Sequence, residues 1–82
     1  PLVTLAVRRG KAPLLAARAT DDGDITSVSV TIDGRPFTTQ LSPVVRRRAS
    51  VLARKGRHRI VVTAEDASGN VSTSTRTLVV RR

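Results

Sequence analysis

Few side chains in this 82-residue sequence are suited to catalytic chemistry. His58 is the single histidine and cysteine is absent, so these residue types supply neither a metal cluster nor a nucleophile paired with a base. The sequence also lacks a glycine-rich phosphate loop and a nucleophile elbow. We therefore expect a protein that is not an enzyme, and the charged side chains remain as candidates for function.

The acidic residues are few and unevenly placed. If the chain forms strands that alternate in direction, five of the six acids fall in loops at the N-terminal end of the molecule, together with an asparagine. Ca²⁺ takes about six to eight oxygen ligands, which carboxylates and an amide carbonyl can supply. Acids in turns can instead bond to their own backbone. A weak Ca²⁺ site is one hypothesis for Asp21, Asp22, Asp24, Asp66 and Asn70, with Glu65 beside them.

The opposite end would be strongly basic. The sequence has 15 Lys and Arg residues and a net charge of +9, a balance that favours anionic lipid, nucleic acid or acidic polysaccharide. Only Lys11 and Lys55 of the basic residues are lysine, and Ala and Val are abundant, so a GC-rich coding sequence would explain much of the arginine without any ligand. Nucleic acid is disfavoured, because stacking needs aromatic rings and Phe37 is the only one. The candidate anion-binding residues are Arg8, Arg9, Lys11, Arg54, Lys55 and Arg57, with Arg35, Arg81 and Arg82 at the same end.

The elements that would position these residues are strands. Apolar side chains alternate with period two between turn signals, and no segment keeps the spacing of an amphipathic helix. Asp33-Gly34 is the strongest hairpin signal, because both central positions of a type I′ turn need positive φ. We expect no helix and strands over 2–7, 13–20, 26–32, 35–40, 44–52, 58–64 and 71–80.

Three local features qualify this pattern. The strand over 44–52 is expected to be irregular, because the run 46–48 of three arginines interrupts it. His58 shares the inward parity of Ile60, which predicts a half-buried ring that caps the core and bonds to a loop; a catalytic or pH-switching role is the alternative. Phe37 is expected to close one edge of the core.

Two segments resemble bacterial immunoglobulin-like domains, which belong to the fibronectin III-like and cadherin-like β-sandwich superfamily. Residues 56–70 match the pattern G-x-H-x-h-x-h-x-A-x-D-x-x-G-N, where h is apolar, and residues 24–35 match I-x-x-V-x-h-x-h-D-G. The paired cysteines, core Trp and corner Tyr of antibody domains are missing. The resemblance implies a single all-β domain over 1–82, an antiparallel Ig-like β-sandwich of about seven strands with Greek-key connections.

The resemblance also implies a functional class. Such modules occur in tandem in adhesins, secreted hydrolases and wall-associated proteins, as spacers or ligand-presenting units. We therefore expect a structural or adhesive module of an extracellular or cell-surface bacterial protein, whose partners are neighbouring domains of the same chain. The alternative is an accessory domain that binds an anionic polysaccharide or cell-wall polymer through its basic end. The start at Pro1 and the lack of a signal-like or membrane-spanning apolar run suggest a piece of a longer protein.

Overall fold

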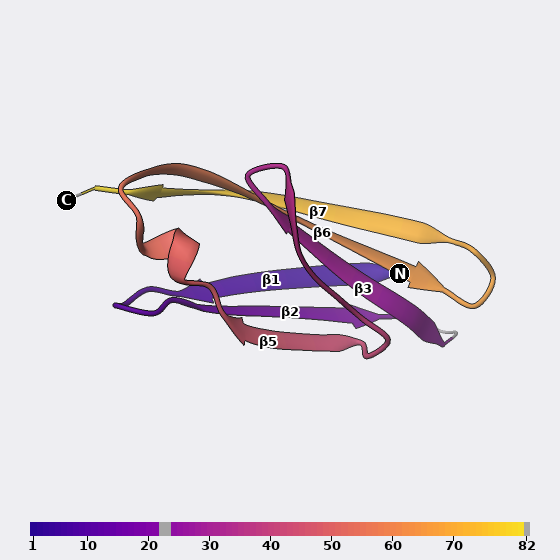
Figure 1. Ribbon diagram of the computed structural model, residues 1–82. Helices are drawn as coiled ribbons and strands as arrows, with labels where there is room; N and C mark the ends of the chain where they lie inside the picture. Colours follow the sequence, from indigo (N-terminus) through magenta and orange to yellow (C-terminus); the bar gives the residue numbers. More distant parts are fainter. Residues whose placement is uncertain (22–23, 82) are drawn as a thin grey trace.

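Two antiparallel β-sheets pack face to face in the computed structural model, which describes residues 1–21 and 24–81 (Figure 1). One sheet has three strands in the order β1-β2-β5, namely β1 (Leu2–Arg8), β2 (Leu14–Thr20) and β5 (Val44–Arg48). The other has four strands in the order β4-β3-β6-β7, namely β4 (Arg35–Gln40), β3 (Ile25–Ile32), β6 (Gly56–Asp66) and β7 (Val71–Val80). The predicted all-β sandwich is therefore confirmed.

The position of β4 defines the sheet order. In constant-type immunoglobulin domains the fourth strand joins the sheet that holds the first, second and fifth. Here β4 pairs with β3 instead, with a bulge between Val30 and Thr31. The sheets consequently divide the strands three and four, with β3 and β6 at the centre of the larger sheet.

The core between the sheets is aliphatic. Alternate residues of β2, β3 and β6 point inward and are buried, as the period-two pattern predicted, and the inward residues of β1 are partly buried against them. Burial of each Val, Leu or Ile side chain stabilises the fold by about 1.5 to 3 kcal/mol relative to leaving it exposed. The largest fully buried side chains are Leu15, Leu52, Ile60, Val28, Val30, Val45 and Val62.

Two arginines close the open edges of the sandwich. The guanidinium of Arg47 lies 5.8 Å from the centre of the Phe37 ring, and Phe37 packs against the core at the β4 edge, as expected. At the other edge, Arg76 of β7 donates a 3.4 Å hydrogen bond to the backbone carbonyl of Leu5 in β1.

The prediction of one irregular strand over 44–52 without any helix was wrong. The arginines do not interrupt pairing, because β5 continues to Arg48 in register with β2. The backbone N–H of Ala49 then donates to the Pro13 carbonyl, and the chain turns into the 3₁₀ helix η1 (Ser50–Ala53). The chain here leaves one sheet for the other, and η1 directs Leu52, which is 1% exposed, into the core. Among the described residues, no helix has the length and apolar character that crossing a membrane requires.

Candidate functional site

The type I′ turn between β3 and β4 places a carboxylate beside the start of β6. Asp33 has φ of 55° and Gly34 has φ of 79°, the pair of positive values that the sequence predicted. One carboxylate oxygen of Asp33, Oδ1, accepts a 2.9 Å hydrogen bond from the backbone N–H of Arg59. The turn is thereby fixed against β6, and its second carboxylate oxygen points at His58.

Both ring nitrogens of His58 are engaged. Nδ1 lies 2.8 Å from Oδ2 of Asp33, and Nε2 lies 2.8 Å from the backbone carbonyl oxygen of Arg54. His58 is 6% exposed, which is deeper than the half-buried position expected, and its ring bonds to a loop as predicted. We call this arrangement of the Asp33 carboxylate, the His58 ring and the Arg54 carbonyl the His58 latch.

The two partners of His58 determine its charge. A carboxylate and a carbonyl oxygen only accept hydrogen bonds, so both ring nitrogens must donate, which is the imidazolium form. The hydrogen bond that His58 donates to Asp33, followed by the one it donates to the Arg54 carbonyl, raises the pKa of His58 above its usual range against the opposing effects of burial and the Arg54 charge. In turn, the His58 hydrogen bond and then the Arg59 N–H lower the pKa of Asp33. The latch is an ion pair between the buried ring of His58 and the exposed carboxylate of Asp33, and its hydrogen bond to the Arg54 carbonyl holds the chain just before Lys55.

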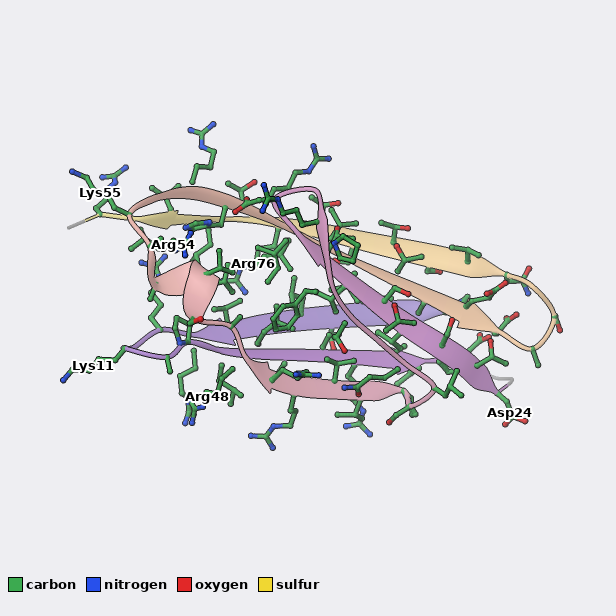
Figure 2. The ribbon with its side chains drawn as sticks, in the orientation of Figure 1. Lys11, Asp24, Arg48, Arg54, Lys55 and Arg76 are labelled. Atoms are coloured by element: carbon green, nitrogen blue, oxygen red, sulfur yellow. The ribbon has the colours of Figure 1, made fainter. Side chains whose placement is uncertain are left out.

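The latch anchors one part of the predicted basic end. Figure 2 shows Lys11, Arg54 and Lys55 at one end of the long axis and Asp24 at the other. A hollow of about 130 Å³ lies at this basic end between Arg9 and Arg81, with Leu52 among the apolar residues that line it. The structure therefore brings Arg9, Lys11, Arg54 and Lys55 to one end of the molecule.

Of the other predicted basic residues, Arg8 and Arg57 lie near the same end of their strands but on the outer faces of the sheets. Arg8 lies on the outer face of β1, because the adjacent residue Val7 points inward and neighbouring residues of a strand face opposite sides. Arg57 lies opposite Val79 on the outer face of β6 and shares that face with Arg59. Arg35 starts β4 beside the Asp33-Gly34 turn, and Arg82 lies outside the described residues.

The predicted acidic residues gather at the opposite end. The β2–β3 loop and the β6–β7 turn are joined there by a 2.9 Å hydrogen bond from the backbone N–H of Ala67 to the carbonyl of Asp24. Thr26 also donates through its hydroxyl to the Glu65 carbonyl. Asp21 and Asp24 are exposed in the loop, whereas Asp22 lies outside the described residues.

Both carboxylate oxygens of Asp66 accept hydrogen bonds within the β6–β7 turn. Its Oδ1 accepts hydrogen bonds from the backbone N–H groups of Ser68 and Asn70, and its Oδ2 accepts one from the Asn70 side-chain amide. The Asn70 amide makes the largest contribution to a pKa of about 2 for Asp66. Within residues 1–21 and 24–81 no cluster of three or more histidine or acidic side chains could hold a metal ion. The Ca²⁺ site stays a prediction, which calorimetry and melting at millimolar Ca²⁺ would test.

Sequence reasoning missed a third charged surface. Arg18, Arg46 and Arg48 lie on the outer face of the β1-β2-β5 sheet together with Arg8. The parity of each strand was readable from the sequence, but the pairing of β5 with β2 was not. That pairing is what places the arginines side by side.

The fold as a whole is similar to that of a protein of known structure. No family model and no curated protein matches this sequence. A solved structure of the fibronectin(III)-like modules of Clostridium thermocellum CbhA superposes with a TM-score of 0.68 and 25% sequence identity, over 98% of this chain and 97% of that chain. The chain has the fibronectin III-like fold. The immunoglobulin-like resemblance is thus confirmed at the level of the β-sandwich superfamily, and the likeness to a fibronectin III-like module supports a non-catalytic structural domain.

Proposed function

We propose that this fibronectin III-like domain is a spacer that aligns neighbouring domains of a larger secreted or cell-surface bacterial protein. The observation that carries the proposal is its polarity along one axis. The molecule measures 43 × 18 × 17 Å, and β1 begins and β7 ends toward opposite ends of its length (Figure 1). A rod with termini at opposite ends extends a chain of domains rather than folding it back.

Charge at the two ends supports an alignment role. The acidic end presents exposed Asp21, Asp24 and Glu65, and the basic end presents Arg54 and Lys55. In a tandem array of like domains, the basic end of one would face the acidic end of the next. Each exposed ion pair contributes only about 0 to 1 kcal/mol, and salt shortens its reach to about 10 Å at 0.1 M. The alignment should therefore be weak and sensitive to salt.

A tandem of two copies tests this role by small-angle X-ray scattering. We expect one extended shape at low salt and a broader distribution of shapes in about 0.5 M salt, where the Debye length is a few ångströms. In a control tandem, Asp24→Asn and Glu65→Gln remove two acidic charges at the junction, and the salt effect should shrink. An original tandem with the same shape at both salt concentrations would contradict the alignment role.

A second candidate function is an accessory domain that binds an anionic wall polymer at the basic end. The hollow between Arg9 and Arg81 favours it, because two guanidinium groups flank an apolar floor that includes Leu52. Affinity for a teichoic-acid-type polymer that survives about 0.5 M salt would support a shaped site. Affinity that disappears at that salt concentration would mean that the polymer is held by non-specific charge attraction and would count against this candidate function.

A further inference from the structure

The outer face of the β1-β2-β5 sheet is an arginine-rich surface built by strand register. Leu5, Ala17 and Val45 mark the inward parity of the three strands, so their sequence neighbours point outward. Register then forms three outward rows across the sheet. These rows are Thr4–Arg18–Val44, Ala6–Ala16–Arg46 and Arg8–Leu14–Arg48.

A groove of about 370 Å³ follows the first two rows. Its floor includes Ala6 and Ala16, which carry only a methyl group, and the long side chains of Arg18 and Arg46 stand beside them. The hollow thus arises from small residues flanked by large ones on a continuous sheet. Its volume falls within the range of about 300 to 1,000 Å³ that is usual for ligand sites.

The positive charge of this face is not neutralised within the sheet. The three described strands contain no Asp or Glu. Among the described residues, Arg8, Arg18, Arg46 and Arg48 form no ion pair. Arg48 instead donates a 3.0 Å hydrogen bond to the Ala12 carbonyl, which holds its guanidinium toward the β1–β2 turn. Four guanidinium groups on one acid-free face create a local positive potential that attracts anions.

The four guanidinium groups of this face are spread along a line rather than clustered at one point. Arg46 and Arg48 are two residues apart in β5, which is about 6.7 Å, and the outer rows that hold Arg18 and Arg8 are about 13 Å apart along the strands. Figure 2 shows Arg48 on the side of the molecule that leads toward Lys11. The line of charge therefore continues from the groove to the basic end, and a linear partner with repeated negative charges matches it better than a small anion.

We propose that the outer face of the β1-β2-β5 sheet binds a linear acidic polysaccharide along the Arg18–Arg46 groove. Arginine forks pair two-pronged with carboxylate or sulfate groups, and the alanine floor lets a sugar ring approach the sheet closely. The face carries no aromatic side chain, so it lacks the stacking platform that single-stranded nucleic acid uses. This inference does not rest on the spacer role, and it names a surface distinct from the hollow at the basic end.

Titration with polygalacturonate, a carboxylated polysaccharide, tests the proposal by calorimetry at about 0.1 M salt. The double variant Arg18→Gln/Arg46→Gln should weaken binding about tenfold, because it removes two charge-assisted contacts. Both side chains are exposed, so the variant should melt like the parent. The matched control Arg35→Gln/Arg59→Gln removes the same charge from the other sheet and should change the affinity by less than about threefold.

Two further variants distinguish the effect of the groove's shape from that of net charge, and binding in the groove from binding at the basic end. Ala6→Gln fills the floor without changing charge, and it should weaken binding by several fold. Lys11→Gln/Lys55→Gln removes two charges at the basic end and should have a smaller effect than the groove variant. Equal losses in every charge variant, or loss only in the Lys11/Lys55 variant, would overturn the proposal, as would unchanged affinity in Ala6→Gln.

A competition experiment tests whether the groove prefers a polysaccharide to nucleic acid. Single-stranded DNA of matched length should compete for the groove more weakly than polygalacturonate at equal charge. Stronger competition by the DNA, lost in the Arg18→Gln/Arg46→Gln variant, would assign the surface to nucleic acid and overturn the polysaccharide.

Discussion

His58 Nδ1 and Asp33 Oδ2 lie 2.8 Å apart and join the β3–β4 turn to the start of β6. The other ring nitrogen faces the Arg54 carbonyl, so the ring is held between two acceptors. Only the imidazolium satisfies both at once. Protonation of His58 therefore strengthens the attachment of both the β3–β4 turn and the Arg54 backbone to the start of β6.

Stability should fall as the solution becomes alkaline. The folded pKa of His58 is raised above its ordinary 6.5, so the latch stabilises the fold fully below pH 6.5 and progressively less as pH rises through the folded value. We expect the free energy of unfolding, measured in urea, to decrease from pH 6 to pH 9. An NMR titration of the imidazole should give a pKa above 6.5.

Two variants isolate this effect. His58→Gln should flatten the alkaline decrease, because the titrating ring is gone. Arg54→Gln keeps the backbone carbonyl that accepts from the ring, and it removes a charge that lowers the pKa of His58. The control should therefore retain the pH dependence and shift it upward. An alkaline decrease that persists in His58→Gln would assign it to another group.

The acidic side of the stability profile should depend on Asp66. Its folded pKa of about 2 lies below the ordinary 3.8, so its stabilising effect is present above pH 3.8 and is lost as pH falls toward 2. Asp33, whose pKa is also lowered, acts in the same direction. Asn70→Ala should raise the pKa of Asp66 and move acid unfolding to higher pH, as followed by circular dichroism.

Ser68→Ala is the matched control for Asn70→Ala. Ser68 donates to Asp66 through its backbone N–H, which alanine retains, so the acid transition should stay where it is. A shift of equal size in both variants would mean that the turn as a whole, and not the Asn70 amide, sets the pKa of Asp66.

Any side chain at Gly34 should destabilise the fold. A Cβ at Gly34 would meet no atom within 4 Å, so crowding is absent and the cost comes from the φ of 79° alone. Gly34→Ala should destabilise the fold by about 1 to 2 kcal/mol. Gly10→Ala is the control, because its surroundings are equally open and its φ is not positive. Equal melting temperatures for the two variants would contradict the strain argument.

Local features of the fold were readable from the sequence, and non-local ones were not. The alternation of Val28, Val30 and Ile32 and the Asp33-Gly34 dipeptide each specify a strand or turn within a few residues, and both were confirmed. The inward parity of His58 gave its burial. Its partners required the pairing of Ile32 with Ile60, which brings Asp33 against β6 and depends on residues 28 apart in sequence.

The charged surfaces show the same division. Net charge and strand direction were sufficient to place Lys11 and Lys55 at one end and Asp24 at the other. The groove between Arg18 and Arg46 was not predictable, because it depends on the pairing of β2 with β5 across the 23 intervening residues 21–43. The turn from β5 into η1 was hidden for a related reason, since a crossing between sheets leaves no periodic signal in the chain.

Leu52 should be the most sensitive of these non-local positions. It follows the end of β5, is 1% exposed, and belongs to the core although it lies in a helix of four residues. Leu52→Ala should cost about 2 to 5 kcal/mol, through lost burial and the cavity left behind. For a domain of this size each kcal/mol lowers the melting temperature by about 4 to 8 °C, so calorimetry should show a large decrease. Leu41→Ala removes the same atoms from a side chain that is 85% exposed and should change stability by less than about 0.5 kcal/mol. If the two variants melted together, η1 would be a surface connection and not part of the core.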